Sequence, residues 1–587
     1  MEQFNHLRMK DIRTYIPILD WLPKYKKSYL RGDLLAGLTV GVMLVPQGMA
    51  YGLLAGLSPI YGLYASIIPL FLYSFFGTSR QLSVGPTALV SLLILAGVGQ
   101  FAETGTEAFI GMALATALIA GVIQILLGVF RLGFLINFLS HPVIAGFTSA
   151  AAFIIGFSQV QNLLRIDIPR SNFVYEVIEN TVLNIGDIHW PTVALSFGGI
   201  VFVLLLKRIN KAIPGTLLAV VASTAVVYLF GLQDQGVEIV KEVPKGFPPV
   251  SIPRIDWPMA QQLLPLALTI CLISFIESLA IARMMESMHK NYRVIPNQEL
   301  IALGLTKIGG AFFHCYPTTG SFTRSAVNND SGAQTGISSM ISAVLIALTL
   351  LFLTPLFFYL PKAILASVII VAVINLVDYR EAIHLWRTDR TDFMTMIVTF
   401  VATLTLGIQS GVFTGVILSL AFMIYRNSKP HISILGQLPN SRSYRNIDRF
   451  EKAIRFNEIL IVRFDAQLYF GNAAYFRESL EGLVEKEGKE LKLLIIDASS
   501  IHDIDSSGIN VLEEFISFLE QRKVQIYLSG VIGPVRDILM KHGLIEKIGT
   551  RNYFMYIHDA VEAFHKRQES GEEDSWTPDA VQTNEKG

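Results

Sequence analysis

Charged residues are scarce in this sequence and cysteine is almost absent. Of 587 residues, 16% are charged and 52% are hydrophobic, and the two cysteines are Cys271 and Cys315. A chain this poor in charge cannot cover the surface of a water-soluble protein, so many of its apolar side chains must face lipid. Two cysteines, both within apolar stretches, support neither a disulfide framework nor a metal-ligand cluster.

The charges that are present cancel one another. The sequence has 47 Lys and Arg and 47 Asp and Glu, so no overall field favours nucleic acid or another charged macromolecule. We find no phosphate-binding loop of the GxxxxGK[ST] type and no grouped nucleophile and base. We therefore expect neither an enzyme nor an ATP-driven pump, and no cofactor or metal. The N-terminus lacks the pattern of a removable signal peptide.

Apolar runs long enough to cross a bilayer, about 20 residues each, recur along most of the chain. They predict about fourteen spans, at 34–55, 59–77, 85–99, 107–130, 142–163, 191–207, 213–231, 260–283, 297–314, 321–331, 336–358, 361–378, 391–410 and 411–426. An even number of spans places both ends of the chain on the same side of the membrane. Basic residues before the first span and in loops of the same parity, such as Lys24, Lys207, Arg283 and Arg387, predict that both ends are cytoplasmic.

The composition changes after the last span. We expect a cytoplasmic N-terminal segment at 1–32, a transmembrane domain at 33–428, a linker at 429–454, a soluble domain at 455–568 and a disordered acidic tail at 569–587. In the soluble domain, apolar strands alternate with amphipathic helices, which predicts an α/β fold. The strands are expected at 459–464, 493–497 and 524–528, and the helices near 473–487, from 505–508 to about 521, and near 533–541.

Two of the expected spans are interrupted at corresponding places. Residues 83–91 read SVGPTALVS and residues 316–327 read YPTTGSFTRSAV, so in each a Gly/Pro break precedes hydroxyl residues. Within a membrane, such breaks survive only against protein or a watery cavity. Breaks matched between two halves of a transporter indicate an inverted repeat with a site at the bilayer midplane. Ordinary turns at the membrane interface are the alternative.

The interrupted spans favour a negatively charged solute. A helix that begins at membrane depth directs unpaired amides and about half a positive charge toward the cavity. Thr87, Ser321 and Thr323 can add hydroxyl donors, and Arg324 adds a full positive charge. Because a charged side chain in a membrane costs about 2.5–3.5 kcal/mol, Arg324 needs an anionic partner.

Glu277 is a carboxylate well inside an expected span. Ionised, it would repel an anionic substrate; protonated, it would not, so it could couple proton uptake to anion entry. It could also pair with Arg283 or Arg324 in a purely structural role. His141 and His314 lie at helix breaks, where single histidines are usually structural, and we interpret them so.

Five short motifs together resemble the SulP family of anion transporters, the bacterial relatives of the animal SLC26 proteins. They are GLTVG at 37–41, VPQGMAY at 45–51, SVGP at 83–86, NQEL at 297–300 and TRS at 323–325. The resemblance extends over almost the whole chain. It implies a polytopic α-helical protein with a seven-plus-seven inverted repeat, in which a core domain moves against a gate domain in an elevator-like cycle. It also implies a homodimer.

The resemblance assigns residues to the anion site. It places Gln47 and Tyr51 beside the anion, with Pro86–Thr87 and Thr323–Arg324 facing it. The alternative for Tyr51 is an aromatic residue at the membrane interface, the commoner role of a lone membrane tyrosine. Family members with an acid at the position of Glu277 include proton-coupled sulfate symporters, which favours H⁺. A sodium-driven bicarbonate carrier of the family uses an acid in this region for Na⁺, so the coupling ion stays open.

The motif DSSG at 505–508 opens a helix of the soluble domain and resembles the STAS domain shared with anti-sigma-factor antagonists. In that domain a serine of the motif can be phosphorylated, so Ser506 and Ser507 are candidate phosphorylation sites, and a cytoplasmic protein is a candidate partner. The alternative is an ordinary helix N-cap, for which Asp and Ser are favoured.

The sequence as a whole predicts secondary active uptake of a small inorganic anion, sulfate or a related oxyanion, by H⁺ symport through a multi-pass protein of the cell (inner) membrane. The alternatives are a bicarbonate or dicarboxylate carrier driven by Na⁺ and an anion exchanger. In a different class, the chain would be an anion sensor that signals through the STAS domain.

Overall fold

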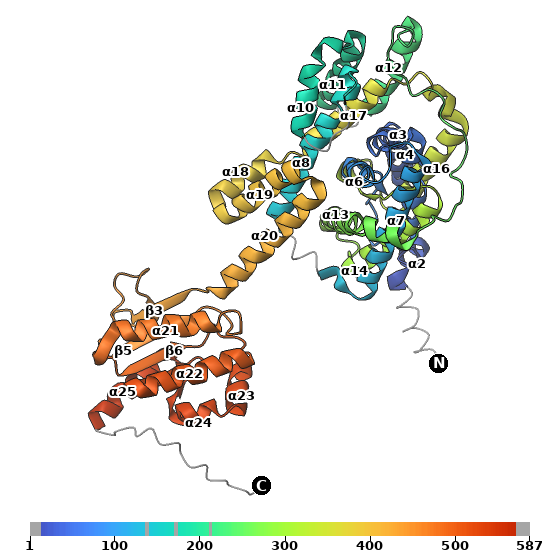
Figure 1. Cartoon of the computed structure of the whole chain (residues 1–587). Helices are drawn as coiled ribbons and strands as arrows, with labels where there is room; N and C mark the ends of the chain where they lie inside the picture. The colour runs from blue at the N-terminus through green and yellow to red at the C-terminus, as the bar shows by residue number, and fades with distance from the viewer. Residues whose placement is uncertain (1–12, 135–139, 169–173, 210–213, 571–587) are drawn as a thin grey trace, which may run out of the picture. The chain divides into compact units, whose positions relative to one another are not determined.

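The computed structural model describes residues 13–134, 140–168, 174–209 and 214–570, and it divides the chain into two compact units, Met1–Ser419 and Leu420–Gly587 (Figure 1). The division falls within helix α20 (Ile408–Ser428), a little before the expected boundary at 428. The start of the expected N-terminal segment, with its basic residues Arg8 and Lys10, and the tail from 571 lie outside the described residues.

The expected spans are helical, and several are interrupted. The first half of the membrane unit contains α2 (Ile18–Trp21), α3 (Tyr29–Leu54), α4 (Pro59–Tyr64), α5 (Ile68–Phe76), strand β1 (Val84–Gly85), α6 (Ala88–Val98), α7 (Glu107–Val129), α8 (His141–Ser158), α9 (Val160–Leu164), α10 (Val174–Leu183), α11 (Trp190–Ile209) and α12 (Gly215–Phe230). The second half contains α13 (Trp257–His289), α14 (Pro296–Phe312), strand β2 (Thr319–Gly320), α15 (Phe322–Asp330), α16 (Ile337–Leu348), α17 (Lys362–Val373), α18 (Tyr379–Thr388), α19 (Arg390–Leu406) and α20.

Among the described residues, eight helical stretches are long and apolar enough to cross a membrane, and three more are apolar but shorter. One of the shorter ones is α6, which begins after the Gly85–Pro86 break. The span expected at 59–77 is divided into α4 and α5. Pro69 stands in the first turn of α5, where a backbone N–H would have no acceptor within the helix, so the proline costs no helical hydrogen bond. The strongly amphipathic α18 was not predicted, because its apolar residues are interspersed with charges.

The helices of the membrane unit form two groups. In the core group, α3 packs against α4 and α16, α7 packs against α13 and α14, and α5 packs against α14 and α16. In the gate group, α8 packs against α17 and α19, and α11 packs against α12 and α17. Figure 1 shows the blue and green core helices around α3, α7 and α13, and the teal and yellow gate helices around α8, α11 and α19. This is the division into core and gate that the resemblance implies.

Glycine sets the spacing of two helix pairs in the core group. A Cβ on Gly62 of α4 would lie 1.8 Å from the carbonyl oxygen of Gly48 on α3. A Cβ on Gly121 of α7 would lie 2.8 Å from the carbonyl oxygen of Gly304 on α14. Small residues allow close backbone approach between helices in lipid, where van der Waals packing replaces the hydrophobic effect as the driving force.

The two chain breaks meet in a short antiparallel pair of strands. Val84 of β1 pairs with Gly320 of β2, and Gly85 pairs with Thr319. The amide of Ser321 also donates to the carbonyl oxygen of Ser83 at 3.0 Å. Helices α6 and α15 start directly after these strands, so the two helix starts lie together, as expected from the interrupted spans.

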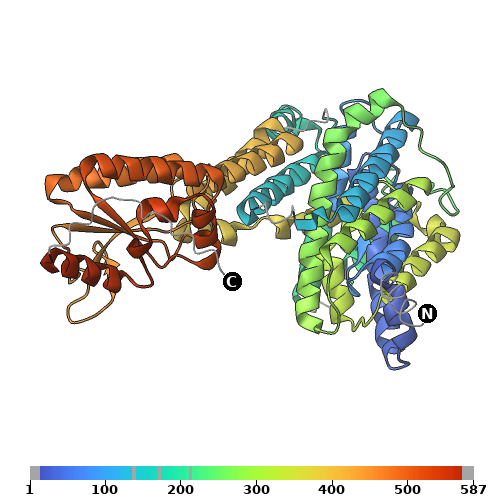
Figure 2. The same ribbon diagram turned by 90° about the horizontal axis from the view of Figure 1, so that it is seen from below.

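The second unit contains an α/β domain around a six-stranded sheet of order β4-β3-β5-β6-β7-β8. Its elements are β3 (Ile432–Gln437), β4 (Tyr444–Asn446), β5 (Ile459–Phe464), α21 (Ala473–Glu487), β6 (Leu493–Asp497), α22 (Ser506–Arg522), β7 (Gln525–Ser529), α23 (Gly533–Lys541), α24 (Leu544–Ile548), β8 (Tyr553–Phe554) and α25 (Ile557–Ser570). Strands β5 to β8 are parallel, and β3 is antiparallel to both of its neighbours. Helices α21 to α24 cover one face of the sheet and α25 covers the other (Figure 2).

The prediction of a linker at 429–454 is corrected by the structure, because these residues contribute strands β3 and β4 to the sheet. These strands are short and lie beside prolines, serines and asparagine, so their sequence resembles a loop. Leu435 and Tyr444 nevertheless pack with the core beneath α25. The helices and strands expected from 459 to 541 are all present within a residue or two of the expected bounds.

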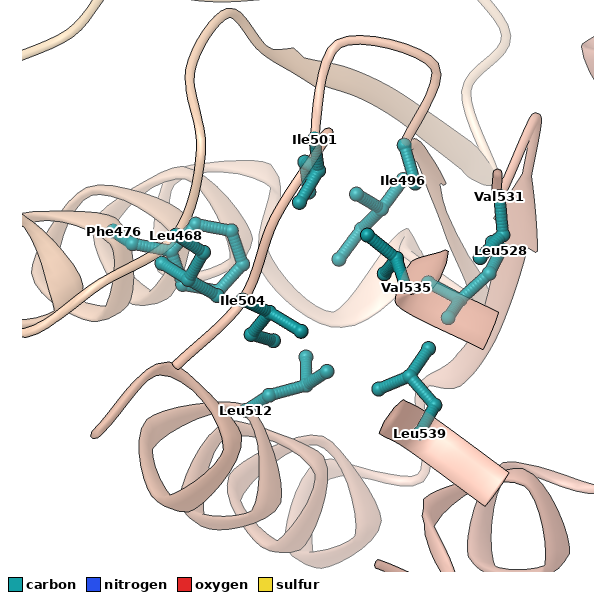
Figure 3. Close-up of a pocket in the computed structure, with 11 residues that line it drawn as sticks. Leu468, Phe476, Ile496, Ile501, Ile504, Leu512, Leu528, Val531, Val535 and Leu539 are labelled. Atoms are coloured by element: carbon teal, nitrogen blue, oxygen red, sulfur yellow. The ribbon is translucent and has the colours of Figure 1, made fainter. Parts of the chain in front are cut away.

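A small apolar void remains between this sheet and its covering helices (Figure 3). Its volume is about 20 Å³, and its lining, which includes Leu468, Ile496, Leu512, Val535 and Leu539, exposes no polar surface to it. A buried water needs two to four polar partners, so the void stays dry. It is a local packing defect and too small to hold a ligand.

Candidate anion site

A hollow of about 320 Å³ lies where α6 and α15 begin. The core group contributes Tyr51, Thr87, Ala88, Leu89, Ile273, Ile276, Glu277, Ala280, Ile281, Ser321, Phe322 and Thr323, and the gate group contributes His141, Val143, Ile144, Phe147, Thr148, Ala372, Leu376 and Val412. Most polar side chains therefore come from the core group, whereas the gate wall is apolar apart from His141 and Thr148.

The starts of α6 and α15 differ in how they are capped. Ser321 caps α15, with its hydroxyl 3.5 Å from the amide of Arg324. Thr87 occupies the same position of α6 in an extended conformation, but its side chain makes no capping bond. Its Oγ1 is buried and has no hydrogen-bond partner among the described residues. The first amides of α6 have no helical acceptor either, so this helix start can accept an anion.

Arg324 joins the two chain breaks and keeps two donors free. Its side chain is 1% exposed, and Nη1 donates to the carbonyl oxygen of Pro86 at 2.8 Å. The guanidinium lies against the backbone of Gly85, where a Cβ would stand 3.3 Å from Nη2. Within the described part of the chain, Nε and Nη2 are buried without a partner. A buried cation with unused donors needs an anionic partner, and an anion in the hollow can supply one.

Glu277 lines the hollow from α13 and, within the described residues, forms no ion pair with Arg283 or Arg324, although Arg324 is near enough to act on it electrostatically. Arg283 binds Glu286 instead, at 3.0 Å. Among the described residues no ion pair within 4.0 Å joins Glu277 to Arg324. Glu277 Oε2 is buried without a hydrogen-bond partner. The carboxyl group is therefore available to a proton or a cation in the hollow.

The remaining residues named from the resemblance have different positions. Tyr51 lines the hollow, as do Ser321 and Thr323. Gln47 is buried one helical turn before Tyr51 on α3 but is not part of the lining. Pro86 and Arg324 also lie outside the lining, and the carbonyl oxygen of Pro86 accepts a hydrogen bond from Arg324.

In the second unit, Asp505 rather than a serine caps α22. Its Oδ1 accepts from the amide of Gly508 at 2.8 Å, and its Oδ2 accepts from the amide of Phe470 at 2.9 Å. Ser506 is exposed and Ser507 is partly exposed in the first helical turn. Both hydroxyls are thus left free of a capping role.

Sequence reasoning missed the position of His141. This residue begins α8, lines the hollow, and places Nδ1 3.2 Å from Oε1 of Glu381 on α18. Its location depends on how α8 packs in the gate group, which no local pattern shows. Within the described residues, no three or more His, Cys, Asp or Glu side chains are grouped so that they could hold a metal ion.

Comparison with known proteins assigns each of the two units to a known family. Residues 30–399 match the model of the sulfate permease family, and residues 452–560 match that of the STAS domain. The chain is 40% identical over 579 residues to sulfate transporter 4.1, chloroplastic, of Arabidopsis thaliana, covering 95% of this chain and 84% of that protein. It is 36% identical over 575 residues to high affinity sulfate transporter 2 of Stylosanthes hamata, covering 94% and 87%.

Solved structures agree with this assignment. The murine Solute Carrier 26 family member A9 anion transporter, in the inward-facing state, superposes with a TM-score of 0.89 at 28% identity, covering 95% of each chain. The transmembrane domain of the cyanobacterial bicarbonate transporter BicA superposes with a TM-score of 0.59 at 21% identity, covering 67% of this chain and 98% of that one, and shows a shared fold.

Proposed function

Because this chain belongs to the sulfate permease family of membrane anion transporters, we propose that it carries sulfate, or a closely related oxyanion, by secondary active transport. The observation that carries the proposal is Arg324, a buried guanidinium with two unused donors, beside the uncapped start of α6. The similar plant proteins are named as sulfate transporters, which favours sulfate among the oxyanions.

The hollow offers an oxyanion several kinds of donor. Thr87 on the lining supplies a hydroxyl, and Arg324, which follows the lining residue Thr323, would supply charge-assisted hydrogen bonds from Nε and Nη2. The amides at the start of α6 add their dipole, and Ser321, Thr323 and Tyr51 lie on the same lining. A volume of about 320 Å³ corresponds to roughly ten water molecules, so a partly hydrated oxyanion has room.

We propose that Glu277 couples transport to a proton. Its carboxyl group lies on the same lining as the anion donors, and no basic side chain holds it ionised through an ion pair within the described residues. An ionised Glu277 would repel a second negative charge in the hollow, where the low dielectric strengthens the repulsion. Protonation removes that repulsion, so a proton and the anion bind together. Sodium in place of the proton is the alternative.

The distribution of polar groups supports an elevator-like movement of the core group. Most anion donors belong to the core group, while the gate wall is largely apolar. A core that carries its own polar site can slide along an apolar wall without breaking hydrogen bonds to it. We propose this movement, in a homodimer of the cell (inner) membrane whose two ends are cytoplasmic, as the positive-inside pattern indicates.

For the STAS domain we propose regulation at Ser506 or Ser507, by phosphorylation or by binding a cytoplasmic protein. Both serines are accessible in the first turn of α22. A phosphate there would be stabilised by the helix dipole but would lie beside the carboxylate of Asp505, which already caps the helix. The added negative charge would therefore disturb the capping bond between Asp505 and Gly508.

The decisive experiment is uptake by the purified full-length protein in liposomes. Labelled sulfate, bicarbonate, chloride and fumarate would be offered separately, each with an imposed pH gradient, an imposed Na⁺ gradient or neither. We expect sulfate uptake that an inward proton gradient accelerates. Uptake that an Na⁺ gradient drives and a pH gradient does not would identify Na⁺ as the coupling ion. Saturable sulfate binding without uptake would identify a sensor in place of a transporter.

A further inference from the structure

Helix α13 holds strand β2 through hydroxyl groups that the anion site described above does not include. The amide of Gly320 donates to Oγ of Ser278 at 2.8 Å. The hydroxyls of Ser278 and Thr319 lie 3.0 Å apart, and Thr319 Oγ1 donates to the carbonyl oxygen of Ser274 at 3.0 Å. All four residues are buried. Two consecutive residues of β2 are therefore bound to Ser274 and Ser278, which share one face of α13.

The direction of each bond in this group follows from the number of protons. Thr319 has one hydroxyl proton and donates it to Ser274, so it accepts the proton of Ser278. Ser278 in turn accepts the amide proton of Gly320. A serine within a helix can bond back to the carbonyl oxygen four residues earlier, which for Ser278 is that of Ser274. Thr319 occupies that acceptor instead, so a bond within the helix is replaced by bonds to the strand.

The strand lies directly against α13 at this point. A Cβ on Gly320 would stand 3.0 Å from Oγ of Ser278 and 3.2 Å from its Cα. Without the hydroxyl of Ser278, the buried amide of Gly320 would lose this acceptor. Because an unpaired amide in a buried position is unfavourable, β2 would shift to find another partner. The hydroxyl therefore sets the distance between β2 and α13.

Strand β2 connects to both helix starts of the anion site. Ser321, the residue after β2, caps α15 and lines the hollow. Across the strand pair, Gly85 faces Thr319 and is followed by Pro86, whose carbonyl oxygen accepts from Arg324. A shift of β2 against α13 would therefore displace the starts of α6 and α15.

We propose that Ser278 is a positioning residue that holds the two helix starts at the separation an oxyanion needs. The inference rests on the proposed function of the hollow as an anion site. Ser278 is not part of the lining, although its neighbour Glu277 is, so it acts on the anion only through β2. Hydrogen bonds weaken steeply away from their preferred distance and angle, so a displaced strand weakens anion binding.

The test is the dependence of the initial rate of labelled sulfate uptake on sulfate concentration, in liposomes that contain the full-length protein. We expect Ser278→Ala to raise the apparent KM roughly tenfold, within the roughly 5–150-fold range of couplings between separate sites. The maximal rate per folded molecule, counted by size-exclusion chromatography before reconstitution, is kept. A merely structural role would lower the number of folded molecules and leave KM as in wild type.

Substitutions of Thr319 give a second, graded measurement. In Thr319→Val, the hydroxyl of Ser278 can bond back to Ser274. It can still accept from the amide of Gly320, so KM should rise less than in Ser278→Ala. Thr319→Ser keeps the hydroxyl and should keep the wild-type KM. If Ser278→Ala does not fold, a higher KM for Thr319→Val than for Thr319→Ser supports the proposal, and equal values overturn it.

The matched control is Ser342→Ala. It removes another buried hydroxyl of the core group, which donates to the carbonyl oxygen of Gly37 at 2.7 Å. That bond joins α16 to α3 and does not involve β2, so KM should stay as in wild type. An equal rise in KM for Ser342→Ala would overturn the proposal, because any lost buried hydrogen bond would then have the same effect.

The outcomes distinguish the positioning role from the proposed function. If wild-type vesicles take up sulfate and a folded Ser278→Ala protein keeps the wild-type KM, Ser278 has no positioning role and the anion site stands. Wild-type vesicles that neither bind nor take up sulfate overturn the proposed function and, with it, the inference.

Discussion

Arg324→Met is the substitution that examines the anion site most directly. Methionine keeps an unbranched side chain of similar length but removes the charge and every N–H. The bond from Nη1 to Pro86 at 2.8 Å is lost, together with the two donors, Nε and Nη2, that have no protein partner. We expect those two donors, which lie next to the lining residue Thr323, to be the charged contacts of a bound anion.

The expected loss of affinity follows from these two donors. A hydrogen bond that involves a charged group contributes about 1.5–3 kcal/mol, so two contribute about 3–6 kcal/mol. Removing a buried guanidinium also relieves its desolvation cost, which offsets part of that sum. We therefore expect a net loss of about 2–4 kcal/mol, which corresponds to a roughly 30- to 700-fold rise in the apparent KM for sulfate.

The assay is the initial rate of labelled sulfate uptake into liposomes over a range of sulfate concentrations. Arg324→Lys keeps the charge without the planar set of donors and should fall between wild type and Arg324→Met. Arg293→Gln removes an exposed arginine of the loop before α14 and should behave as wild type. An Arg324→Met protein that is folded and keeps the wild-type KM would refute the reasoning, because it would show that this cation does not contact the anion.

Three further outcomes are expected. Glu277→Gln should abolish stimulation of uptake by an inward proton gradient while sulfate counterflow persists, since the variant cannot exchange a proton; unchanged stimulation would exclude Glu277 as the coupling group. Gly62→Ala should prevent assembly of a monodisperse protein, because its Cβ would lie 1.8 Å from a carbonyl oxygen, whereas Gly111→Ala, with no atom within 4 Å, should be tolerated. In the STAS domain, Leu512→Ala should lower the free energy of unfolding by about 2.7–5 kcal/mol. Val535→Ile, which adds one methylene at the dry void, should raise it by at most about 0.8 kcal/mol. Hydrogen exchange of the β6 amides in the full-length protein would report both changes, and faster exchange in Val535→Ile would contradict the second expectation.

The membrane helices were predictable because apolar length and Gly/Pro breaks are local properties of a sequence. The same local signals located the two breaks, and the pairing of Gly85 with Thr319 confirms that they meet. Strands β3 and β4 were not predictable in this way. Residues such as Leu435 and Tyr444 become core residues only through α25, which lies more than a hundred positions further along the chain.

The types of residue that form the site could be predicted from the sequence, but the contacts between them could not. A lone arginine after a membrane break indicates an anion, but the bond from Arg324 to the carbonyl oxygen of Pro86 requires both halves of the fold. Arg283, which the sequence offered as a partner of Glu277, binds Glu286 instead, and the spacing of these residues in the sequence leaves that choice open. His141 reaches the hollow only because of the way in which α8 packs, which is a property of tertiary structure.

The pairing of β1 with β2 also has a consequence for how the protein is made. Thr319 follows its partner Gly85 by 234 positions, the difference between the two residue numbers. At about 5–20 residues per second, a ribosome needs roughly 10–50 s to add that length of chain. If the chain enters the membrane as it is synthesised, the polar backbone around Gly85 lies there without its partner strand during this interval. The nascent chain must therefore be sheltered, by the insertion machinery or by water, until its second half arrives.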